Sequence, residues 1–496
     1  MDATKNETVD FNNDTQMKRG LTNRMVQLIA IGGTIGTGLF LGAGKTIHLT
    51  GPSVLLIYLI VGAFMFVMMR AIGEMMYFDP SQHTFINFIT KYLGRATGHF
   101  AGWSYWLTLT IVGMAEITAV STYFVTFFQT FGIHLAKYAW LIQVGFLLGL
   151  VLINLLAVSI FGEAEFWFAL IKITLIVGLI ITGVVMVILS YHYQAVHISG
   201  SNTIAPAGAA SLTNIINHFS LFPHGPLNFI IAFQMVFFAY QAVEFVGITT
   251  SETKDPRKVL PKAINQIPIR IFIFYIGALF AIMAIVKWTN FAPNADGSYN
   301  SPFIMVFQYA GANWASTLVF FVVLTSAASA LNSILYSTGR HMYQLALDSN
   351  SKVMQRFRHV TKQGVPSVAI LFSAACVMLS PLIKSIPAVS NAFTTLTSAS
   401  TAVYIGIYML LMVAHYKYRK SEDFMPDGFK MPAYKILNPL TIVFFALIYM
   451  TLFLSKDTMI SAVGGVIWVV VFGLLSIDHV RREDKRAAIN PQISHS

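Results

Sequence analysis

Apolar stretches of about 20 residues recur along almost the whole chain, and this repetition limits the possible folds more than any other feature. Each stretch is long enough to cross the roughly 30 Å hydrocarbon core of a bilayer as a helix. Hydrophobic residues make up 56% of the 496 residues and charged residues only 11%, whereas soluble domains carry roughly one quarter charged residues. The mean hydropathy is +0.66. The sequence therefore predicts an all-α integral membrane protein.

Twelve membrane spans are predicted, and the basic residues support this even number. Lys and Arg gather before the first span and in the connections that follow every even-numbered span. Because cytoplasmic loops carry an excess of Lys and Arg, both termini are expected in the cytoplasm, and the net charge of +11 requires no nucleic acid partner. The predicted spans cover residues 24–46, 52–78, 97–129, 138–159, 164–190, 227–250, 266–288, 311–346, 365–383, 388–415, 433–454 and 458–477.

The first span contains an unusual glycine-rich run, IGGTIGTGLF at residues 31–40. Each glycine weakens a helix interior by about 1 kcal/mol relative to alanine. Close packing of helices is one explanation for such a run. The sixth span favours a second one, because FFAYQAVEFVG at residues 237–247 places Gln241 and Glu244 at mid-membrane depth. Polar groups at that depth cost a few kcal/mol unless they face a cavity or a partner.

Spans one and six occupy corresponding positions if the chain consists of two repeats of five spans. Since five is odd, the second repeat would be inverted, which is typical of secondary transporters that bind a substrate between two unwound helices. Exposed main-chain amides after Gly32–Gly36 suit a carboxylate, and carbonyl groups near Phe237–Tyr240 suit an ammonium group. The two breaks together predict a site for a zwitterionic amino acid.

Four motifs then resemble a known family. They are LTNRMVQLIAIGGTIGTGLFLGAGKTIHLTGPS (21–53), FGEAEFWFALIKI (161–173), ETKDPRKVLPKAIN (252–265) and TSAASALNSILYSTGR (325–340). Their order and content are similar to the amino acid transporter family of the amino acid–polyamine–organocation superfamily, over about residues 17–480. Among its members, the motifs resemble those of bacterial D-serine/D-alanine/glycine permeases.

The resemblance implies a leucine-transporter-like fold: a five-plus-five inverted repeat with discontinuous helices 1 and 6, followed by two further helices. It divides the chain into a cytoplasmic tail (1–20), a first repeat (21–190), an extracellular connection (191–226), a second repeat (227–415), two final helices (416–480) and a second cytoplasmic tail (481–496).

The resemblance also assigns a substrate site. Phe238 corresponds to an aromatic residue that closes over the substrate in relatives, and Ala242 stands where many relatives have glycine, so its methyl group would narrow the site. Glu116 in the third span either pairs with a neighbouring group or contacts the substrate. The expected substrate-binding residues are Gly32, Gly33, Thr34, Gly36, Thr37, Gly38, Glu116, Phe237, Phe238, Tyr240 and Ala242.

Two further charged residues are candidates for proton coupling. Lys172 lies about nine residues from the nearest end of the fifth span, which is far for a lysine that reaches the interface. Burial favours its uncharged amine, so it can release and accept a proton. In related proton-coupled carriers the corresponding lysine occupies the place where sodium-coupled members of the same fold bind a sodium ion. Glu244 either holds the break of the sixth span or senses pH, and the secondary candidates are Gln241, Ser326 and Ser329. The two serines lie with Asn332 on the eighth span, where such residues commonly bond main-chain carbonyl groups of other helices.

Other classes of function fit less well. The chain has neither an HExxH nor a GxSxG motif, so an intramembrane enzyme is not expected. Its single cysteine, Cys376, and its scattered histidines offer no metal-ligand spacing, and no metal or cofactor is expected. No signal for an oligomeric state is present. The expected function is a proton-coupled permease that imports small neutral amino acids, such as D- or L-alanine, D- or L-serine and glycine, across a bacterial plasma membrane. A permease for branched-chain or aromatic amino acids and a sodium-coupled carrier are the alternatives.

Overall fold

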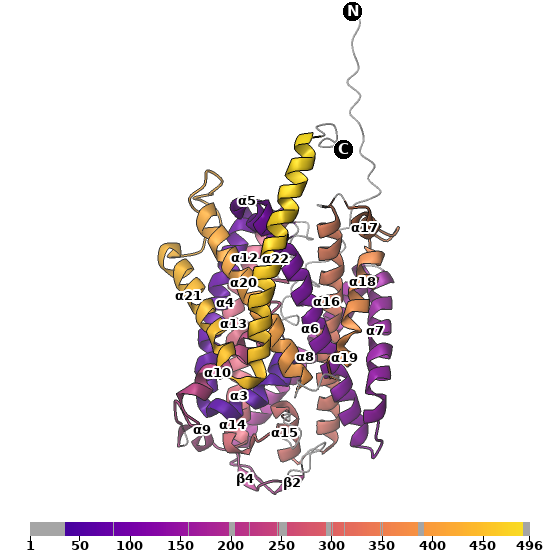
Figure 1. The fold of residues 1–496 in the computed structure, drawn as a ribbon. Coiled ribbons are helices and arrows are strands. Elements are labelled where there is room, and N and C mark those ends of the chain that lie inside the picture. Colours follow the sequence, from indigo (N-terminus) through magenta and orange to yellow (C-terminus); the bar gives the residue numbers. More distant parts are fainter. Residues whose placement is uncertain are drawn as a thin grey trace, which may run out of the picture.

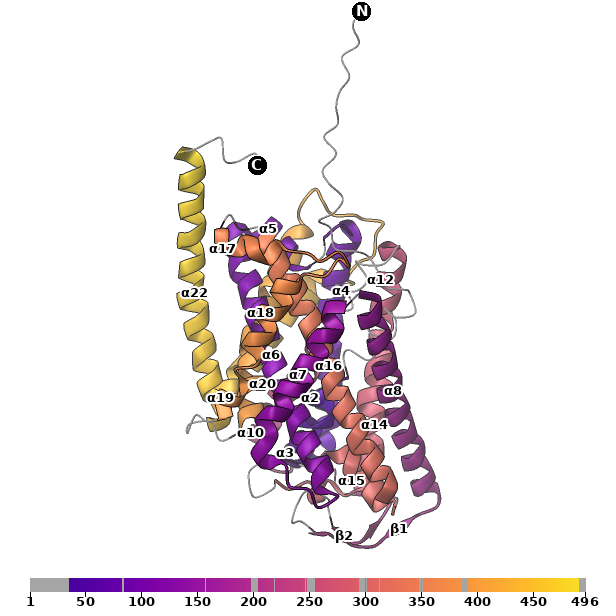
Figure 2. The ribbon, with the colours of Figure 1, turned by 90° about the vertical axis from the view of Figure 1, so that its right-hand side faces the viewer.

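The protein is a bundle of long, roughly parallel helices (Figures 1 and 2). A computed structural model describes residues 35–489 apart from 83, 157, 198–203, 218, 246, 248–254, 294–298, 300, 312, 348, 350 and 385–390. Within those ranges, nine helical stretches are long and apolar enough to cross a membrane, and two shorter apolar helices accompany them. Gly32, Gly33 and Thr34 of the predicted site lie outside the described residues.

The N-terminal half runs from the glycine-rich segment to a connection at one end of the bundle, which contains two short pairs of strands and one short helix. Its helices are α2 (Thr37–Phe40), α3 (Gly42–Thr50), α4 (Val54–Phe78), α5 (Ile86–Leu93), α6 (Arg95–Gln129), α7 (Ala139–Leu156), α8 (Val158–Ile188) and α9 (Thr213–Ile216). Strand β1 (His192–Tyr193) pairs antiparallel with β4 (Gly208–Ala209), and β2 (Val196–His197) pairs antiparallel with β3 (Ile204–Ala205).

The C-terminal half begins at the sixth predicted span and ends in a long helix. Its helices are α10 (Pro226–Ala239), α12 (Pro256–Asn265), α13 (Ile267–Arg270), α14 (Ala278–Ile285), α15 (Pro302–Tyr309), α16 (Asn313–Leu347), α17 (Lys352–Gln355), α18 (Ser367–Val377), α19 (Ser380–Lys384), α20 (Ala392–Tyr418), α21 (Tyr434–Thr451) and α22 (Lys456–Ile489). A π-helical segment, Ile271–Gly277, joins α13 to α14.

Several elements differ from the sequence prediction. The short helices α5 and α15 and the four two-residue strands lie in segments predicted as connections. Helix α22 continues well beyond the predicted end of the last span at residue 477 and projects from the bundle (Figures 1 and 2). Its charged end stays helical beside α6, where Arg95 bonds Glu483 at 2.9 Å.

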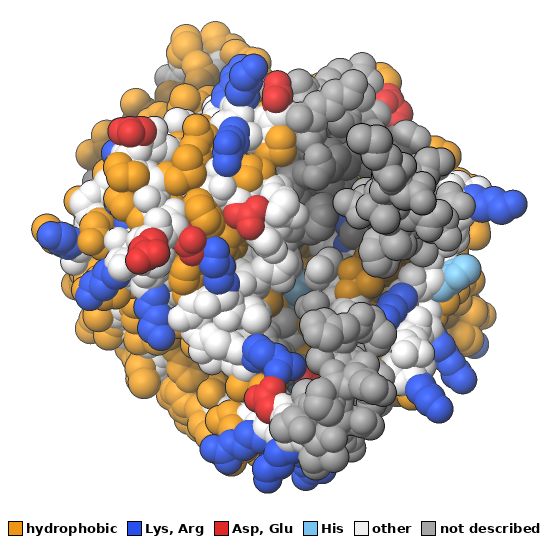
Figure 3. All heavy atoms as spheres, turned by 90° about the horizontal axis from the view of Figure 1, so that it is seen from above, with side chains coloured by type: hydrophobic (Ala, Val, Ile, Leu, Met, Phe, Trp, Pro, Cys, Tyr) orange, Lys and Arg blue, Asp and Glu red, His pale blue; other side chains and the backbone are white. Residues whose placement is uncertain are grey.

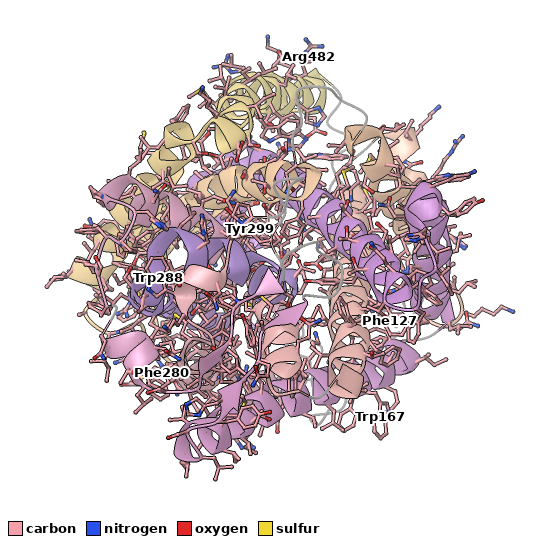
Figure 4. All side chains as sticks on the ribbon, turned by 90° about the horizontal axis from the view of Figure 1, so that it is seen from below. Phe127, Trp167, Phe280, Trp288, Tyr299 and Arg482 are labelled. Carbon is pink, nitrogen blue, oxygen red and sulfur yellow. The ribbon has the colours of Figure 1, made fainter. Side chains whose placement is uncertain are left out.

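The middle of the bundle is formed by α6 and α16, which pack along each other and are largely buried. The outer surface is apolar: Leu152, Phe272 and Leu474 are each more than 60% exposed. Trp167 lies at the rim of the bundle when it is viewed along the helices (Figure 4). Apolar side chains that would be costly to expose to water are expected where a helix faces lipid. The exposed belt therefore fits a membrane protein.

Candidate functional site

Two helix ends meet near the middle of the bundle. Helix α10 ends at Ala239, about halfway along the predicted sixth span, and α2 begins at Thr37 after an extended Gly36. The two helices pack against each other. A Cβ atom on Gly38 would lie only 2.5 Å from the Cα atom of Ala239, so only glycine permits this approach.

After Ala239 the chain turns through residues 240–244 without continuing the helix. Within this turn Ala242 has a φ of +68°, in the left-handed region that residues with a Cβ atom adopt at a cost of about 1–2 kcal/mol. Glycine adopts this conformation freely. The strain explains why a glycine at this position, as the family resemblance implies, is the easier solution for the backbone.

A small cavity lies beside these helix ends. Six of the predicted site residues line it: Gly36, Gly38, Glu116, Phe238, Gln241 and Ala242. The remaining lining residues come from α6, the end of α10, the segment that follows the turn after α10, and α16: Val112, Ala239, Phe245, Ala330, Ser333 and Ile334. The walls are apolar with a few polar groups, as is typical of sites for small molecules.

Glu116 brings a carboxyl group from α6 to the start of α2. The Thr37 hydroxyl donates to its Oε1 atom at 2.8 Å, and both side chains are buried. Its Oε2 atom is also buried and has no hydrogen-bond partner among the described residues. Since buried oxygens normally accept hydrogen bonds, Oε2 can accept one from a molecule in the cavity.

Lys172 is fully buried on α8 and reaches the other side of the same break. Its Nζ atom donates to the carbonyl oxygen of Ile35 at 3.1 Å, and the Ser326 hydroxyl donates to the same oxygen at 3.3 Å. Ile35 directly precedes the extended Gly36. The lysine therefore holds a main-chain carbonyl at the helix break.

Glu244 does not line the cavity, and it lies fully buried among three tyrosines. The hydroxyls of Tyr105 and Tyr404 donate to its Oε1 atom at 3.0 Å each, and Tyr408 donates to Oε2 at 2.6 Å. The carboxyl group thus joins the turn after α10 to α6 and α20. This arrangement fits the prediction that Glu244 holds the break.

Comparison with known proteins identifies the family. The model for the family described as "Amino acid permease" matches residues 25–486. The chain belongs to the amino acid permease family. Its members are transporters, so this permease is not an enzyme.

Several curated bacterial relatives match this permease over nearly its whole length. The DL-alanine permease SerP2 of Lactococcus lactis is 49% identical, over 92% of this chain and 95% of the relative. The serine permease SerP1 of the same species is 47% identical, over 94% of this chain and 98% of the relative. The D-serine/D-alanine/glycine transporter of Escherichia coli K12 is 37% identical, over 93% of this chain and 94% of the relative.

Three predicted site residues of the permease point away from the cavity. The Tyr240 hydroxyl donates to the carbonyl oxygen of Tyr58 on α4 at 2.9 Å. The Phe237 ring packs against Tyr408 and Phe445 instead. Ser329 donates to Glu165 at 2.8 Å. Thr37 is absent from the lining residues and reaches the site through Glu116.

Other polar residues of the site were missing from the sequence prediction. Ser400 donates to Gln241 Oε1 at 3.1 Å and Gln241 Nε2 donates to Thr401 at 3.0 Å, so α20 fixes the orientation of this amide. Glu165 was also missed, although it lies seven residues before Lys172, a spacing that places both on one face of a helix. Among the described residues, no group of three metal-ligating side chains occurs.

Proposed function

We propose that this permease imports small neutral amino acids together with protons, using twelve spans that form a five-plus-five inverted repeat with two further helices. The names of the relatives support the substrate class, because they refer to alanine, serine and glycine. The cavity supports it as well, since Phe238 and the Ala242 methyl group leave little room for a long side chain.

The groups around the cavity suit the two charged ends of an amino acid. Gly36 and Gly38 line the cavity at the start of α2 and bring main-chain groups to its wall, which suits a carboxylate. Glu116 offers a carboxyl group for the ammonium end of the substrate, because its Oε2 atom has no donor within the described part of the chain. No basic side chain is found among the described lining residues, so substrates with an acidic side chain would lack a counter-ion.

The contact between Lys172 and Ile35 is the observation that carries the proposal of proton coupling. In related folds, carbonyl oxygens of an unwound helix coordinate the coupled cation. Here the Lys172 side-chain nitrogen already bonds that carbonyl, together with the Ser326 hydroxyl. A lysine can gain and lose a proton at this place, whereas a sodium ion would have to displace it. The contact therefore favours protons over sodium.

The basic side chains support an orientation with both termini in the cytoplasm. Helices α5, α12 and α17 lie at the same end of the bundle as the end of α22 (Figures 1 and 2). Seen from this end, Lys and Arg side chains surround the rim of the molecule (Figure 3). The helices at this end carry Lys91 on α5, Arg257 on α12 and Lys352 on α17. By the positive-inside rule this is the cytoplasmic end.

Reconstituted protein tests the function directly. In proteoliposomes with an inward proton gradient and no sodium, labelled alanine should accumulate. A proton that enters with a neutral zwitterion gains about 2.3 kcal/mol per 100 mV, which corresponds to roughly fiftyfold accumulation. Unlabelled alanine, serine and glycine should compete better than leucine, lysine or glutamate.

A Lys172→Ala variant is the control for coupling. It should lose accumulation but keep exchange of labelled for unlabelled alanine, because Lys172 contacts the helix break and is absent from the cavity lining. Uptake that requires sodium and ignores the proton gradient would refute proton coupling. A variant that still accumulates alanine normally would remove Lys172 from the mechanism.

A further inference from the structure

Glu165 is a buried carboxyl group on α8 for which the transport site described above has no use. It is only 1% exposed and does not line the cavity. It lies seven residues, about two helical turns, before Lys172, so both side chains project from one face of α8. A buried carboxyl group at membrane depth is costly unless other groups stabilise it.

Neighbouring helices supply hydrogen-bond donors to both oxygens of Glu165. From α16, Ser329 donates to Oε2 at 2.8 Å and the Asn332 amide donates to Oε1 at 2.7 Å. Asn154 on α7 donates in turn to the Asn332 carbonyl oxygen at 2.7 Å, which fixes the direction of that amide. Hydrogen-bond donors on both oxygens favour the ionised form of this carboxyl group.

Lys172 is the charge that this carboxylate faces. It interacts electrostatically with Glu165 and, more weakly, with Glu116 on α6. Within the described part of the chain, a further titratable group nearby is Tyr123 on α6, which interacts electrostatically with Glu116. The groups that α16 and α7 contribute here are uncharged: Ser326, Ser329, Asn332 and Asn154.

The Glu165 carboxylate also lies close to the cavity. Ser333, one helical turn after the Glu165 partner Ser329 on α16, lines the cavity. The same helix therefore holds Glu165 through Ser329 and forms part of the cavity wall through Ser333.

We propose that Glu165 is the fixed counter-ion of Lys172: it positions the lysine against the Ile35 carbonyl and sets the pH range in which the permease transports its substrate. This inference rests on the proposed proton coupling and assigns it to a pair of residues on α8. Glu165 is a positioning residue, since it touches neither the cavity nor the helix break. In this proposal Lys172 gains and loses the proton that moves with the substrate, and Glu165 stays ionised throughout.

Alanine uptake by proteoliposomes at a series of external pH values tests this proposal. In Glu165→Gln the ammonium form of Lys172 loses the carboxylate that interacts with it most strongly, so the midpoint of the pH profile should move to lower pH by about one unit or more. The KM for alanine at the most acidic pH should stay within about twofold, because the cavity is intact. Glu165→Asp keeps the charge and should restore most of the wild-type profile.

Two further variants separate this effect from general damage. Glu163→Gln makes the same change two residues away, where the Glu163 side chain bonds the rim residue Trp167, and it should leave the profile unchanged. Asn332→Ala removes one donor to Glu165 and should move the midpoint in the same direction by a smaller amount. Counterflow of alanine, which needs no gradient, shows whether each variant still binds and translocates.

The outcomes distinguish this inference from the proposed function. If the wild-type protein ignores the proton gradient, the proposed function fails and the inference falls with it. If the wild type is proton-driven but Glu165→Gln keeps the wild-type midpoint, Glu165 is not the counter-ion. A folded Glu165→Gln protein without counterflow at any pH, or an equal shift in Glu163→Gln, would make the residue structural and overturn the inference.

Discussion

Ala242 has two effects: its backbone has a strained positive φ, and its methyl group limits the volume of the cavity. Substitutions can show which of the two effects determines selectivity. In Ala242→Gly the left-handed φ of +68° becomes unstrained, which relieves about 1–2 kcal/mol, while the added freedom of the unfolded chain costs about 0.4–1 kcal/mol. Stability should therefore stay the same or rise slightly. The cavity gains the volume of a methyl group, so valine should compete with labelled alanine roughly tenfold better than in the wild type.

Ala433 provides the matched control for this residue. It also has a positive φ, +45°, but it is exposed before α21 and does not line the cavity. Ala433→Gly should have a similar effect on stability and none on competition by valine. Equal changes in selectivity for both variants would mean that backbone freedom, and not the methyl group, determines substrate size.

At the scale of elements, the contact between α2 and α10 depends on Gly38. A Gly38→Ala variant would place its Cβ atom 2.5 Å from the main chain of Ala239 and force the helices apart. Overpacking of this kind costs about 1–3 kcal/mol, and we expect uptake to fall about tenfold or more. Gly178→Ala on α8 is the control, because its Cβ atom would meet open space. Normal uptake by Gly38→Ala would contradict the close approach.

The sequence predicted elements better than side-chain directions. The long helices follow from apolar stretches of membrane length, and the breaks at Gly36 and Ala239 follow from the glycine run and the polar residues beside it. Phe237 and Phe238 were both assigned to the site, yet neighbours on a helix point about 100° apart and only Phe238 lines the cavity. Glu165 was missed because its partners Ser329 and Asn332 lie on α16, far away in the sequence.

Across the whole molecule, Glu74 connects parts of the chain that are distant in sequence. From α4 its Oε2 atom accepts from Arg419 at 2.9 Å and from the Met431 main-chain amide at 2.8 Å, and it contacts His415 at 3.0 Å. Glu74 is buried, so Glu74→Gln leaves the guanidinium of Arg419 without its carboxylate. We expect a loss of about 3–5 kcal/mol in the free energy of unfolding, measured by denaturant titration in detergent.

The exposed pair of Lys91 and Asp423 offers the comparison. Their charged atoms lie 2.7 Å apart and both side chains are at least 33% exposed. The hydrogen bond from Lys91 lowers the pKa of Asp423, so the contact persists at neutral pH and is lost only as the pH falls through that lowered value. Asp423→Asn should cost no more than about 1 kcal/mol. Equal losses for both variants would show that burial does not strengthen the Glu74 contacts.

The missing side chain at Gly38 has a mechanical consequence. Where two helices touch through side chains, rotamer changes can compensate for small shifts of one helix against the other. At Gly38 and Ala239 the backbones themselves are in contact, so no side chain can adjust between them. We therefore expect α2 and α10 to move together as a rigid body during transport, so that a displacement of one helix end beside the cavity also displaces the other helix end.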